Sequence, residues 1–385
     1  MTAPGAARFA LFTPEHEALR ASVRAFVEKE IHPHVEEWER AGDFPRSLYG
    51  RMGELGFLGL KYPEEFGGTG PDVLADVIVV EELARCGSGG VAAGIGGSKD
   101  LGSYYVYRFG NDEQRKRWLA PSIAGEAIGA LGVTEPDAGS DVASLRTRAV
   151  RDGDEYVVNG SKVFITNGPK ADYVVTAVRT GGEGYAGISL LVIEAGTPGF
   201  TTRRIDTVGW RTSQTGELRF EDCRVPAANL LGAEGEGFVA IMKNFQWERI
   251  IMALGAVSSA AQILDTAIGY AREREAFGRP IAKFQVWKHR FADLATEIEA
   301  ARALTYHAVR KFVAGEDALR EVSMAKAMAC ELDWHVADEC VQVHGGYGYM
   351  MEFSAQRAWR DARLGPIGGG TTEIMREIIA KTYGL

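Results

Sequence analysis

Apolar residues recur at helical spacing through the first third of the chain. Thr13 can cap a helix that begins at Pro14, and the acids Glu15 and Glu17 suit its first turn. The pattern predicts helical segments over residues 13–31, 45–55, 73–85 and 112–123. Glycine-rich stretches at residues 66–70 and 87–97 are expected to break the helices. Residues 1–125 are therefore predicted to form a helical domain.

Near Ala127 the pattern changes to short runs rich in Val, Ile, Thr and aromatic residues, which are typical of β-strands. The runs are VTEPD, EYVVNGSKVFIT, DYVVTAVRT, GISLLVIEA, GFTTRRI and GELRFEDCRV. Asn159-Gly160 stands between YVV and KVFIT, and this dipeptide predicts a hairpin turn. Residues 126–232 are expected to form a compact β domain, a small barrel or sandwich.

Helical spacing returns near Gly235 and continues to the end of the sequence. Amphipathic segments cover residues 238–274, 285–314, 317–344 and 372–382. Their lengths suit a four-helix bundle over residues 233–385. The expected fold class is thus α+β, with an N-terminal helical domain, a central β domain and a C-terminal four-helix bundle.

Length and composition favour a soluble protein of more than one domain. The chain has 385 residues, of which 46% are hydrophobic and 25% are charged. Its net charge of −9 argues against nucleic acid or an anionic membrane surface as a default partner. The four cysteines show no metal-binding spacing, so we expect buried thiols in a reducing compartment and no metal site.

Two further observations favour a cytoplasmic location. The N-terminal stretch MTAPGAARFALF lacks the charged and apolar regions of an export signal. The weakly polar run at residues 250–264 contains two serines and is shorter than the ~20 residues that a membrane helix needs.

The stretch LGVTEPDAGSD, residues 131–141, carries the first candidate chemistry. Its hydroxyls, Thr134 and Ser140, and its turn glycine, Gly139, could bind the polar edge of a planar cofactor. A second hydroxyl-bearing stretch, KVFITNG, follows at residues 162–168. The two stretches could converge within one small β region, although the first alone could equally be a surface loop.

The order of these domains and motifs resembles the acyl-CoA dehydrogenase family over nearly the whole chain. The motifs run from YPEEFGGTG at residue 62, through TEPDAGSD, to GGGTTEIMRE at residue 368. The resemblance implies FAD as cofactor, held by Thr134 at the pyrimidine side, Phe164 beside the ring and the Thr166 hydroxyl at N5. Ser140 would face the pantetheine or the diphosphate. Neighbouring positions of the same two stretches would complete the flavin site, namely Leu131, Val133, Gly139 and Ile165.

The resemblance also implies that a neighbouring subunit of a homotetramer, or of a homodimer, holds part of the AMP half of FAD. The matching residues are Arg274, Phe277, Gln285, Gln342, Gly345 and Gly346, and Thr371 and Glu373 would also contact FAD. From the residues alone, Arg274 could be a solvated cation at a helix end, and the two glycines could simply end a helix. His344 is expected to be a packing or flavin-side residue.

Dehydrogenation of a thioester needs a carboxylate base. Medium-chain and short-chain relatives carry a glutamate where this chain has Gly369. The isovaleryl and long-chain subgroups carry the base on a bundle helix, and Glu248 in FQWERIIMALGA matches that placement. Burial against apolar neighbours would make Glu248 a stronger base, whereas an exposed ion pair is the structural alternative. Glu373 is not assigned as the base.

The remaining expectations concern the substrate. By resemblance, Arg249 orients the active site and the CoA chain, and the Gly369 N–H bonds the thioester oxygen. Further substrate contacts are expected at Ser140, Phe245, Gly97 and Gly370. A small residue at Gly97 would permit a deep pocket for long acyl chains, but Tyr104, Tyr105 and Tyr107 could close it.

The activity so implied is conversion of an acyl-CoA to its trans-2-enoyl-CoA, as in fatty-acid β-oxidation, with electrons passing to an electron-transfer flavoprotein. Three alternatives remain open. One is a flavin-dependent oxidase or monooxygenase, another is a dehydrogenase of a carrier-protein thioester, and the third is a non-catalytic helical interaction protein.

Overall fold

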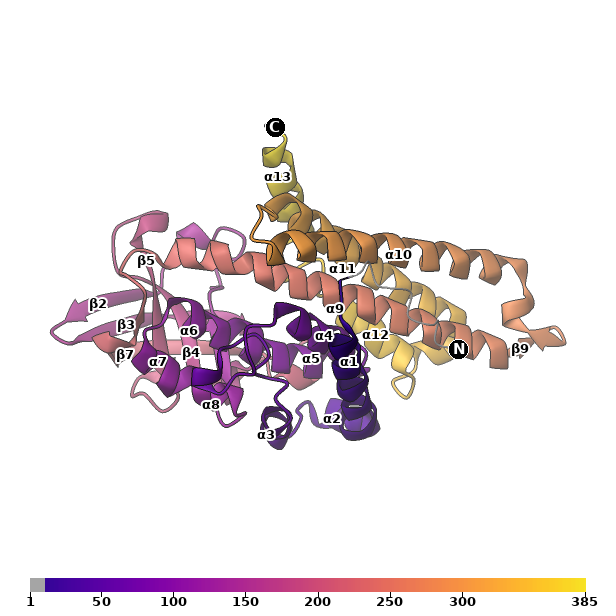
Figure 1. Ribbon diagram of the computed structural model, residues 1–385, viewed down its shortest axis with the longest axis horizontal. Helices are drawn as coiled ribbons and strands as arrows, with labels where there is room; N and C mark the ends of the chain where they lie inside the picture. The colour runs from indigo at the N-terminus through magenta and orange to yellow at the C-terminus, as the bar shows by residue number, and fades with distance from the viewer. Residues whose placement is uncertain (1–10) are drawn as a thin grey trace.

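A computed structural model describes residues 11–385. Residues 1–10, which contain most of the stretch considered above for an export signal, lie outside the described residues. Figure 1 shows the helices of the N-terminal third in indigo to purple and the strands of the central third of the chain gathered at one end of the molecule. The long C-terminal helices extend from the strands to the opposite end.

The N-terminal helices follow the apolar pattern. Helix α1 (Pro14–Phe26) starts at Thr13, whose hydroxyl accepts a hydrogen bond from the backbone N–H of His16. It continues through a π-helical turn to Ile31, and α2 (Val35–Ala41) follows. The other predicted segments contain α3 (Ser47–Glu54), α4 (Val73–Leu83), α7 (Asp112–Gln114) and α8 (Ala120–Ile123).

The predicted break at residues 87–97 is wrong, because this stretch forms α5 (Gly89–Gly96). A π-helical turn (Gly97–Gly102) and α6 (Ser103–Phe109) continue it. The Ser88 hydroxyl caps α5, and the glycines let other elements approach closely. A Cβ atom at Gly90 would lie 2.2 Å from Oγ1 of Thr212, and one at Gly94 would lie 2.7 Å from the Phe44 ring. Close tertiary packing thus outweighs the low helix propensity of glycine.

The β domain is one sheet that folds over itself. Its strands are β1 (Gly129–Gly132), β2 (Arg148–Asp152), β3 (Glu155–Ile165), β4 (Tyr173–Arg179), β5 (Ile188–Glu194), β6 (Phe200–Arg204), β7 (Gly216–Pro226) and β8 (Leu230–Leu231). The order is β6-β7-β3-β2-β4-β5-β8, and β1 pairs in parallel with β4. One residue pair, Arg148 with Arg179, joins β2 to β4. Apolar side chains of β3 and β7 meet those of β4 and β5 in one core.

The predicted hairpin turn at Asn159-Gly160 is also wrong. Both residues lie inside β3, and the turn between β2 and β3 falls instead around Gly153, which has φ +61°. Gly160 has φ +147° at a register shift between β3 and β7. A Cβ atom there would lie 2.7 Å from the Thr147 Cα. The glycine therefore allows a bulge and a close backbone approach rather than a turn.

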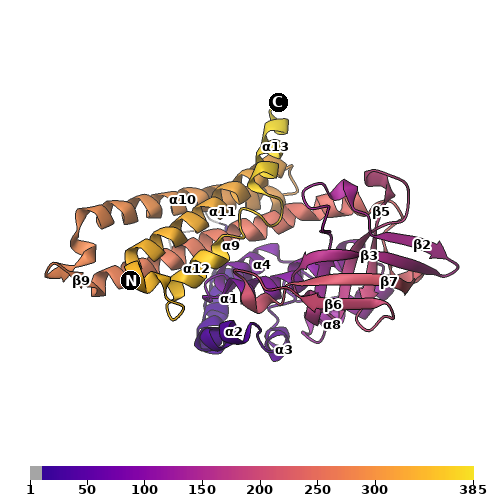
Figure 2. The same cartoon turned by 180° about the vertical axis from the view of Figure 1, so that it is seen from behind.

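Three long helices form the body of the C-terminal domain: α9 (Gly237–Glu273), α10 (Gln285–Val313) and α11 (Leu319–His344). A small hairpin, β9 (Glu275–Ala276) and β10 (Arg279–Pro280), joins α9 to α10. Two shorter helices pack on α11. They are α12 (Ser354–Ala362), which the periodicity did not reveal, and α13 (Thr372–Thr382). Figures 1 and 2 both show α13 projecting from the bundle.

Helix α9 is the central helix of the molecule. By length and composition it could span a membrane, but 56% of its most apolar window is buried inside the protein. Its buried side chains pack against α4, α10 and α11. The burial of α9 is that of a core helix in a folded domain. All four cysteines are buried and free, as predicted.

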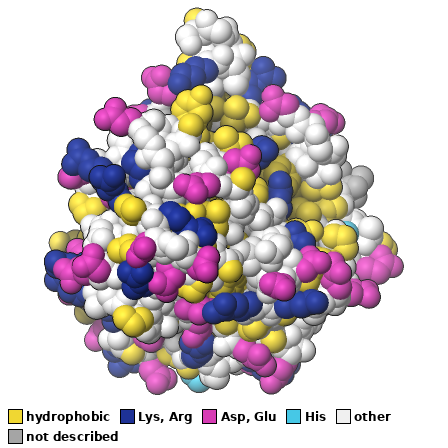
Figure 3. All heavy atoms as spheres, turned by 90° about the vertical axis from the view of Figure 1, so that its left-hand side faces the viewer, with side chains coloured by type: hydrophobic (Ala, Val, Ile, Leu, Met, Phe, Trp, Pro, Cys, Tyr) yellow, Lys and Arg dark blue, Asp and Glu magenta, His cyan; other side chains and the backbone are white. Residues whose placement is uncertain are grey.

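The outer face of the β-domain end carries interspersed acidic and basic side chains (Figure 3). Charges of both signs therefore alternate over this face, and neither sign forms a continuous patch on it (Figure 3).

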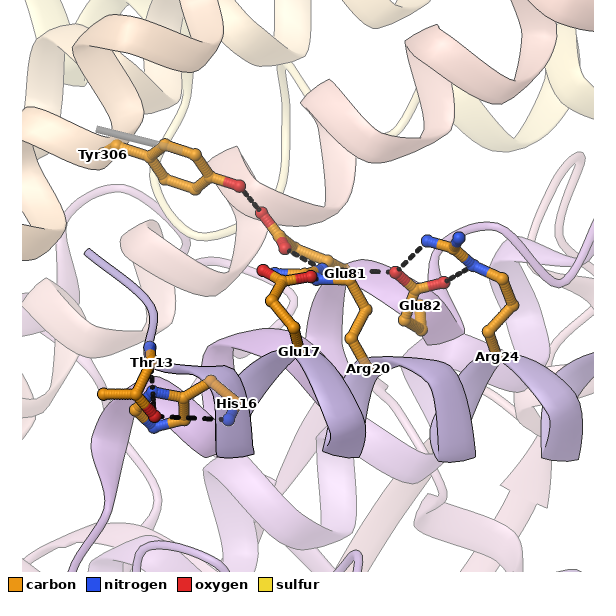
Figure 4. A network of polar contacts seen from close by, with 8 residues as sticks. All are labelled: Thr13, His16, Glu17, Arg20, Arg24, Glu81, Glu82 and Tyr306. Carbon is orange, nitrogen blue, oxygen red and sulfur yellow. Dashed lines mark hydrogen bonds and ion pairs between the residues drawn. The ribbon is translucent and has the colours of Figure 1, made fainter. Parts of the chain in front are cut away.

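A buried ionic network ties the N-terminal domain to the bundle. Arg20 of α1 donates to Glu81 at 2.5 Å and to Glu82 at 3.2 Å, both on α4. Arg24 also pairs with Glu82, and the Tyr306 hydroxyl of α10 donates to Glu81. Figure 4 shows these side chains converging between the three helices. The network therefore fixes how α1 and α4 meet α10.

Replacing Arg20 by Met is expected to destabilise the protein by about 3 kcal/mol, because Glu81 and Glu82 would lose a buried positive partner. Thermal unfolding of the FAD-loaded protein measures the effect. Arg51→Met is the control, since Arg51 pairs with Glu30 and Glu54 at the surface and should contribute about 1 kcal/mol or less. Equal shifts for the two variants would contradict this role of the buried network.

Candidate active site

The two hydroxyl-bearing stretches converge, as their sequence positions suggested. The Val163 N–H donates to the Thr134 carbonyl oxygen at 2.9 Å. Beneath them Lys162 is fully buried, and its Nζ donates to Glu135 Oε1 at 2.8 Å and to the Val133 carbonyl oxygen at 3.1 Å. We call the two joined stretches around Thr134 and Val163 the platform. Thr134 is half-buried at its surface, and Gly139 and Ser140 are exposed.

Glu135 is an anchor of this loop rather than part of its exposed polar edge. It accepts hydrogen bonds from the backbone N–H groups of Arg146 at 2.6 Å and Thr147 at 2.9 Å. Burial acts to raise the pKa of Glu135, but Lys162 and these donors hold it below its ordinary value. Burial lowers the pKa of Lys162 to about 8, so the lysine is still charged at neutral pH. The pair holds the loop in shape.

The second stretch presents an exposed aromatic ring on strained backbone. Phe164 has φ +61°, and its side chain is 66% exposed. The next turn is fixed by Asn167, which has φ +63° and donates from its amide to the Gly94 carbonyl oxygen at 2.7 Å. Strained residues that the surroundings hold in place are common at ligand sites. Phe164 thus offers an apolar surface that a planar ring could cover.

Gly97 lies against this second stretch. A Cβ atom at Gly97 would lie 3.0 Å from Cγ2 of Thr166. The close approach of Thr166 is therefore enough to explain the glycine, because Thr166 occupies the space that a side chain at position 97 would need.

Glu248 lies on α9, where it is buried and faces α6. The Tyr105 hydroxyl donates to its Oε1 at 3.0 Å. Burial raises the pKa of Glu248 to about 7, and Asp100 adds to this effect. Tyr105, Arg249 and Asn244 act in the opposite direction. The carboxyl group is therefore poised to gain and lose a proton near neutral pH.

The loop before α13 explains why a glutamate is absent from position 369. Gly369 has φ +63°, and a Cβ atom there would lie 2.4 Å from Sδ of Met252. The Arg249 Nε donates to the Gly369 carbonyl oxygen at 3.3 Å, and the Lys326 Nζ donates to that of Gly370 at 2.7 Å. These bonds hold the loop backbone beside Arg249, the residue that follows Glu248.

Several other predicted residues lie around this loop. The Thr371 hydroxyl caps α13 by accepting from the Ile374 N–H, and Glu373 is exposed on its first turn. The Arg249 guanidinium lies over the Phe245 ring, 5.6 Å from its centroid.

Three predicted flavin-site residues, Leu131, Val133 and Ile165, lie in or next to strands β1 and β3 of the β domain. Val133 and Ile165 are buried.

The remaining predicted residues lie far from Glu248 in the same chain. Arg274, His344, Gly345 and Gly346 line a cavity of about 550 Å³ where α9 meets α11. Phe277 has φ +53° and is 96% exposed on the β9–β10 hairpin. Gln342 and Gln285 are also exposed, the latter at the start of α10. Figure 1 shows this hairpin at the end of the bundle opposite the β domain.

These surfaces fit FAD. The platform of Thr134 and Val163 joins backbone polar groups to the exposed ring of Phe164, as a flavin ring requires. The distant cavity contains a guanidinium, Arg274, beside glycines whose Cβ positions at 345 and 346 meet no atom within 4 Å, so backbone could approach a diphosphate. Among residues 11–385, no group of three or more His, Cys, Asp or Glu side chains is placed to hold a metal ion.

Comparison with known families decides the assignment. The N-terminal domain model of acyl-CoA dehydrogenases matches residues 13–126, the middle domain model residues 130–223 and the C-terminal domain model residues 235–384. The chain belongs to the acyl-CoA dehydrogenase family. It is an FAD-dependent oxidoreductase with the three-domain fold predicted from its sequence.

Individual relatives cover nearly the whole chain. The mitochondrial long-chain specific acyl-CoA dehydrogenase of Sus scrofa is 40% identical over 375 residues, covering 96% of this chain and 87% of the relative. The mitochondrial isovaleryl-CoA dehydrogenase of Pongo abelii is 36% identical and covers 96% of this chain and 88% of the relative. The predicted resemblance to these two subgroups is confirmed.

Solved structures agree with this assignment. An electron transferring flavoprotein structure from Acidaminococcus fermentans contains a chain that is 41% identical, with a TM-score of 0.93, covering 97% of this chain and 98% of that one. A glutaryl-CoA dehydrogenase from Mycobacterium smegmatis, in complex with FADH2, is 31% identical with a TM-score of 0.91, covering 97% of this chain and 96% of that one.

Two residues around Glu248, Tyr105 and Asn244, are not assigned to its surroundings by the sequence analysis. Tyr105 is expected there only as a side chain that could close the acyl pocket. Asn244 lies four residues before Glu248 and is therefore on the same face of α9. Once α9 is recognised, that spacing could have identified Asn244. The contact between Tyr105 and Glu248 joins positions 143 residues apart, which no local pattern reveals.

Glu248→Gln is expected to stabilise the FAD-loaded protein above pH 7 and to leave its stability nearly unchanged at pH 4.5. The folded-state pKa of about 7 lies above the ordinary value of 4.5, so keeping this carboxyl buried costs stability as pH rises through that interval. The gain at pH 8 should be about 3 kcal/mol, measured by thermal unfolding at both pH values. A gain that does not depend on pH would contradict the raised pKa.

Proposed function

We propose that this enzyme oxidises an acyl-CoA thioester to the trans-2-enoyl-CoA, with Glu248 as the base that removes the α proton. The observation that carries the proposal is the buried position of Glu248 on α9, with a pKa near 7, while the positive φ of Gly369 and its contact with Met252 disfavour a side chain at the alternative position of the base. When bound, FAD supplies the acceptor for the hydride that leaves the β carbon.

The other residues of the site bind and orient. Thr134 and Thr166 would hold the flavin through their hydroxyls, Phe164 would lie beside the ring, and Ser140 would face the pantetheine or the diphosphate. The backbone N–H of Gly369 would donate to the thioester oxygen and stabilise the negative charge that develops there. The hydrogen bond from Arg249 to the Gly369 carbonyl supports this loop in the required position.

We also propose that the distant cavity with Arg274 serves the FAD of another subunit. Arg274 directly follows the last residue of α9, roughly 40 Å along this helix from Glu248, and this separation supports the arrangement. Phe277, exposed over 96% of its surface, would become covered in such an assembly, a homotetramer or homodimer. The proposed domains are residues 1–125, 126–232 and 233–385.

We further propose that the enzyme passes its electrons to an electron-transfer flavoprotein. We also propose that it acts in the cytoplasm, in fatty-acid β-oxidation. The chain similar to this one in the electron transferring flavoprotein structure supports the choice of acceptor. The buried thiols and the central, packed position of α9 support a soluble enzyme of a reducing compartment.

Anaerobic titration of the FAD-loaded enzyme with acyl-CoAs of different length and branching tests the reaction. Bleaching of the visible flavin band by one class is expected, with the enoyl-CoA as product. If no acyl-CoA bleaches the flavin, the proposed reaction is wrong and carrier-protein thioesters are the next substrates to examine. Rapid reoxidation by oxygen would instead indicate an oxidase.

Glu248→Gln is expected to slow flavin reduction by the best acyl-CoA at least ~1,000-fold, because the amide cannot accept the α proton. In the unaltered enzyme the reduction rate should rise with pH through about 7, since the base acts in its ionised form. Stopped-flow absorbance measures both effects. Glu377→Gln is the control, because Glu377 is exposed on α13 and has no assigned role in the site. Normal reduction by the Glu248→Gln enzyme would exclude Glu248 as the base.

A further inference from the structure

Tyr105 makes a direct contact with the proposed base. It lies on α6, is fully buried and donates from its hydroxyl to one carboxyl oxygen of Glu248, Oε1, at 3.0 Å. Burial raises the pKa of Tyr105 well above its ordinary value, and the neighbouring Glu248 adds to that effect. The phenol therefore keeps its proton throughout the working pH range and acts only as a donor.

The other groups that face Glu248 do not duplicate this bond. Asn244 is 1% exposed and lies near enough to lower the pKa of Glu248, but neither of its amide atoms meets hydrogen-bond geometry with a described residue. Arg249, the next residue on α9, is directed to the Gly369 carbonyl oxygen. Among the hydrogen bonds of residues 11–385, the Tyr105 hydroxyl is the donor to the Glu248 carboxyl group.

A buried charge cluster lies behind the base. Asp100, in the π-helical turn before α6, accepts from Trp247 Nε1 at 3.1 Å and from Lys99 Nζ at 3.0 Å. Lys61 also pairs with Asp100, and Asp76 pairs with both lysines. Two lysines and two aspartates thus balance formally in charge. The Trp247 bond fixes α9 against this turn, one residue away from Glu248.

We propose that Tyr105 is a positioning residue that holds Oε1 of Glu248, so that Oε2 is the oxygen that removes the substrate's α proton. The inference rests on the proposed function. In the reaction the bond from Cα to hydrogen breaks, and the proton moves to Oε2. The electron pair left behind forms the double bond between Cα and Cβ as hydride leaves Cβ for FAD, the oxidant. Tyr105 keeps its proton and its hydrogen bond throughout.

This arrangement has a consequence for the pH dependence. A hydrogen bond from Tyr105 is stronger to the ionised carboxylate than to the neutral acid, so it lowers the pKa that burial has raised. Without the hydroxyl, the base is protonated over a wider pH range. Its free oxygen is also no longer fixed in direction.

The test compares Tyr105→Phe with Tyr173→Phe in the FAD-loaded enzyme, by stopped-flow reduction with the best acyl-CoA at several pH values. Tyr173 is an equally buried tyrosine whose hydroxyl lies near Ser103 and Ser122, at 3.3 and 3.0 Å. For Tyr105→Phe the midpoint of the pH profile should rise by about one unit. The rate at pH 7 should fall about tenfold or more, with a smaller change in the substrate concentration that gives half the maximal rate. Tyr173→Phe should keep the original midpoint.

An unchanged midpoint and rate in Tyr105→Phe would overturn the inference. If Tyr105→Phe cannot be purified with FAD, the test compares Tyr105→Gln with Tyr105→Met. Glutamine and methionine have side chains of similar length, but only glutamine can donate a hydrogen bond to Glu248. A midpoint nearer the original for Gln than for Met supports the inference, and equal midpoints overturn it. Glu248→Gln, measured in parallel, separates the two proposals. Normal flavin reduction by Glu248→Gln refutes the assignment of Glu248 as the base. If Glu248→Gln loses flavin reduction while Tyr105→Phe keeps the original pH profile, only the role of Tyr105 is refuted.

Discussion

A carboxyl group buried on the longest described helix, α9, is the constraint on which the site depends. Glu248 is 6% exposed, and ionisation of a carboxyl group away from water is costly. The protein reduces this cost with one hydroxyl, an amide and a neighbouring guanidinium. The balance leaves the pKa at about 7, so the group is neither a permanently ionised surface acid nor a permanently neutral one.

Other parts of the structure follow from that placement. A side chain at Gly369 would meet Met252 on the turn of α9 that follows Glu248, so the loop before α13 brings only backbone to this place. Gly94 of α5 lets Asn167 approach from the β domain, and Gly97 of the π-helical turn that follows α5 does the same for Thr166. The buried pair of Lys162 and Glu135 holds the facing loop. Three domains therefore meet at one site, each through a close contact that a larger or unpaired residue would disturb.

The sequence was most informative where local pattern and local structure agree. Apolar periodicity located α9, α10 and α11, and the family motifs indicated the fold, the cofactor and the candidate base. It failed where tertiary contacts override local preference. Asn159-Gly160 would favour a turn in isolation, but β3 pairs on both sides and continues through it. The glycines at 89–96 form a helix because Thr212, Phe44 and their neighbours lie against it.

Other contacts between distant positions have no local pattern that predicts them. The bond from Tyr105 to Glu248 and the cluster of Lys61, Asp76, Lys99 and Asp100 depend on how α6 and the preceding turn pack on α9. The residues assigned to FAD by resemblance fall into separate groups, and Arg274, Gly345 and Gly346 line a cavity of their own at the end of α9.

Direct titration of the Glu248 carboxyl group tests the account most closely. Infrared difference spectra between the FAD-loaded enzyme and its Glu248→Gln variant isolate the carbonyl stretch of the protonated acid. This band should be present at pH 5.5 and should disappear with a midpoint near pH 7. A carboxyl group already ionised at pH 5.5 would contradict the claim that burial prepares Glu248 to act as the base.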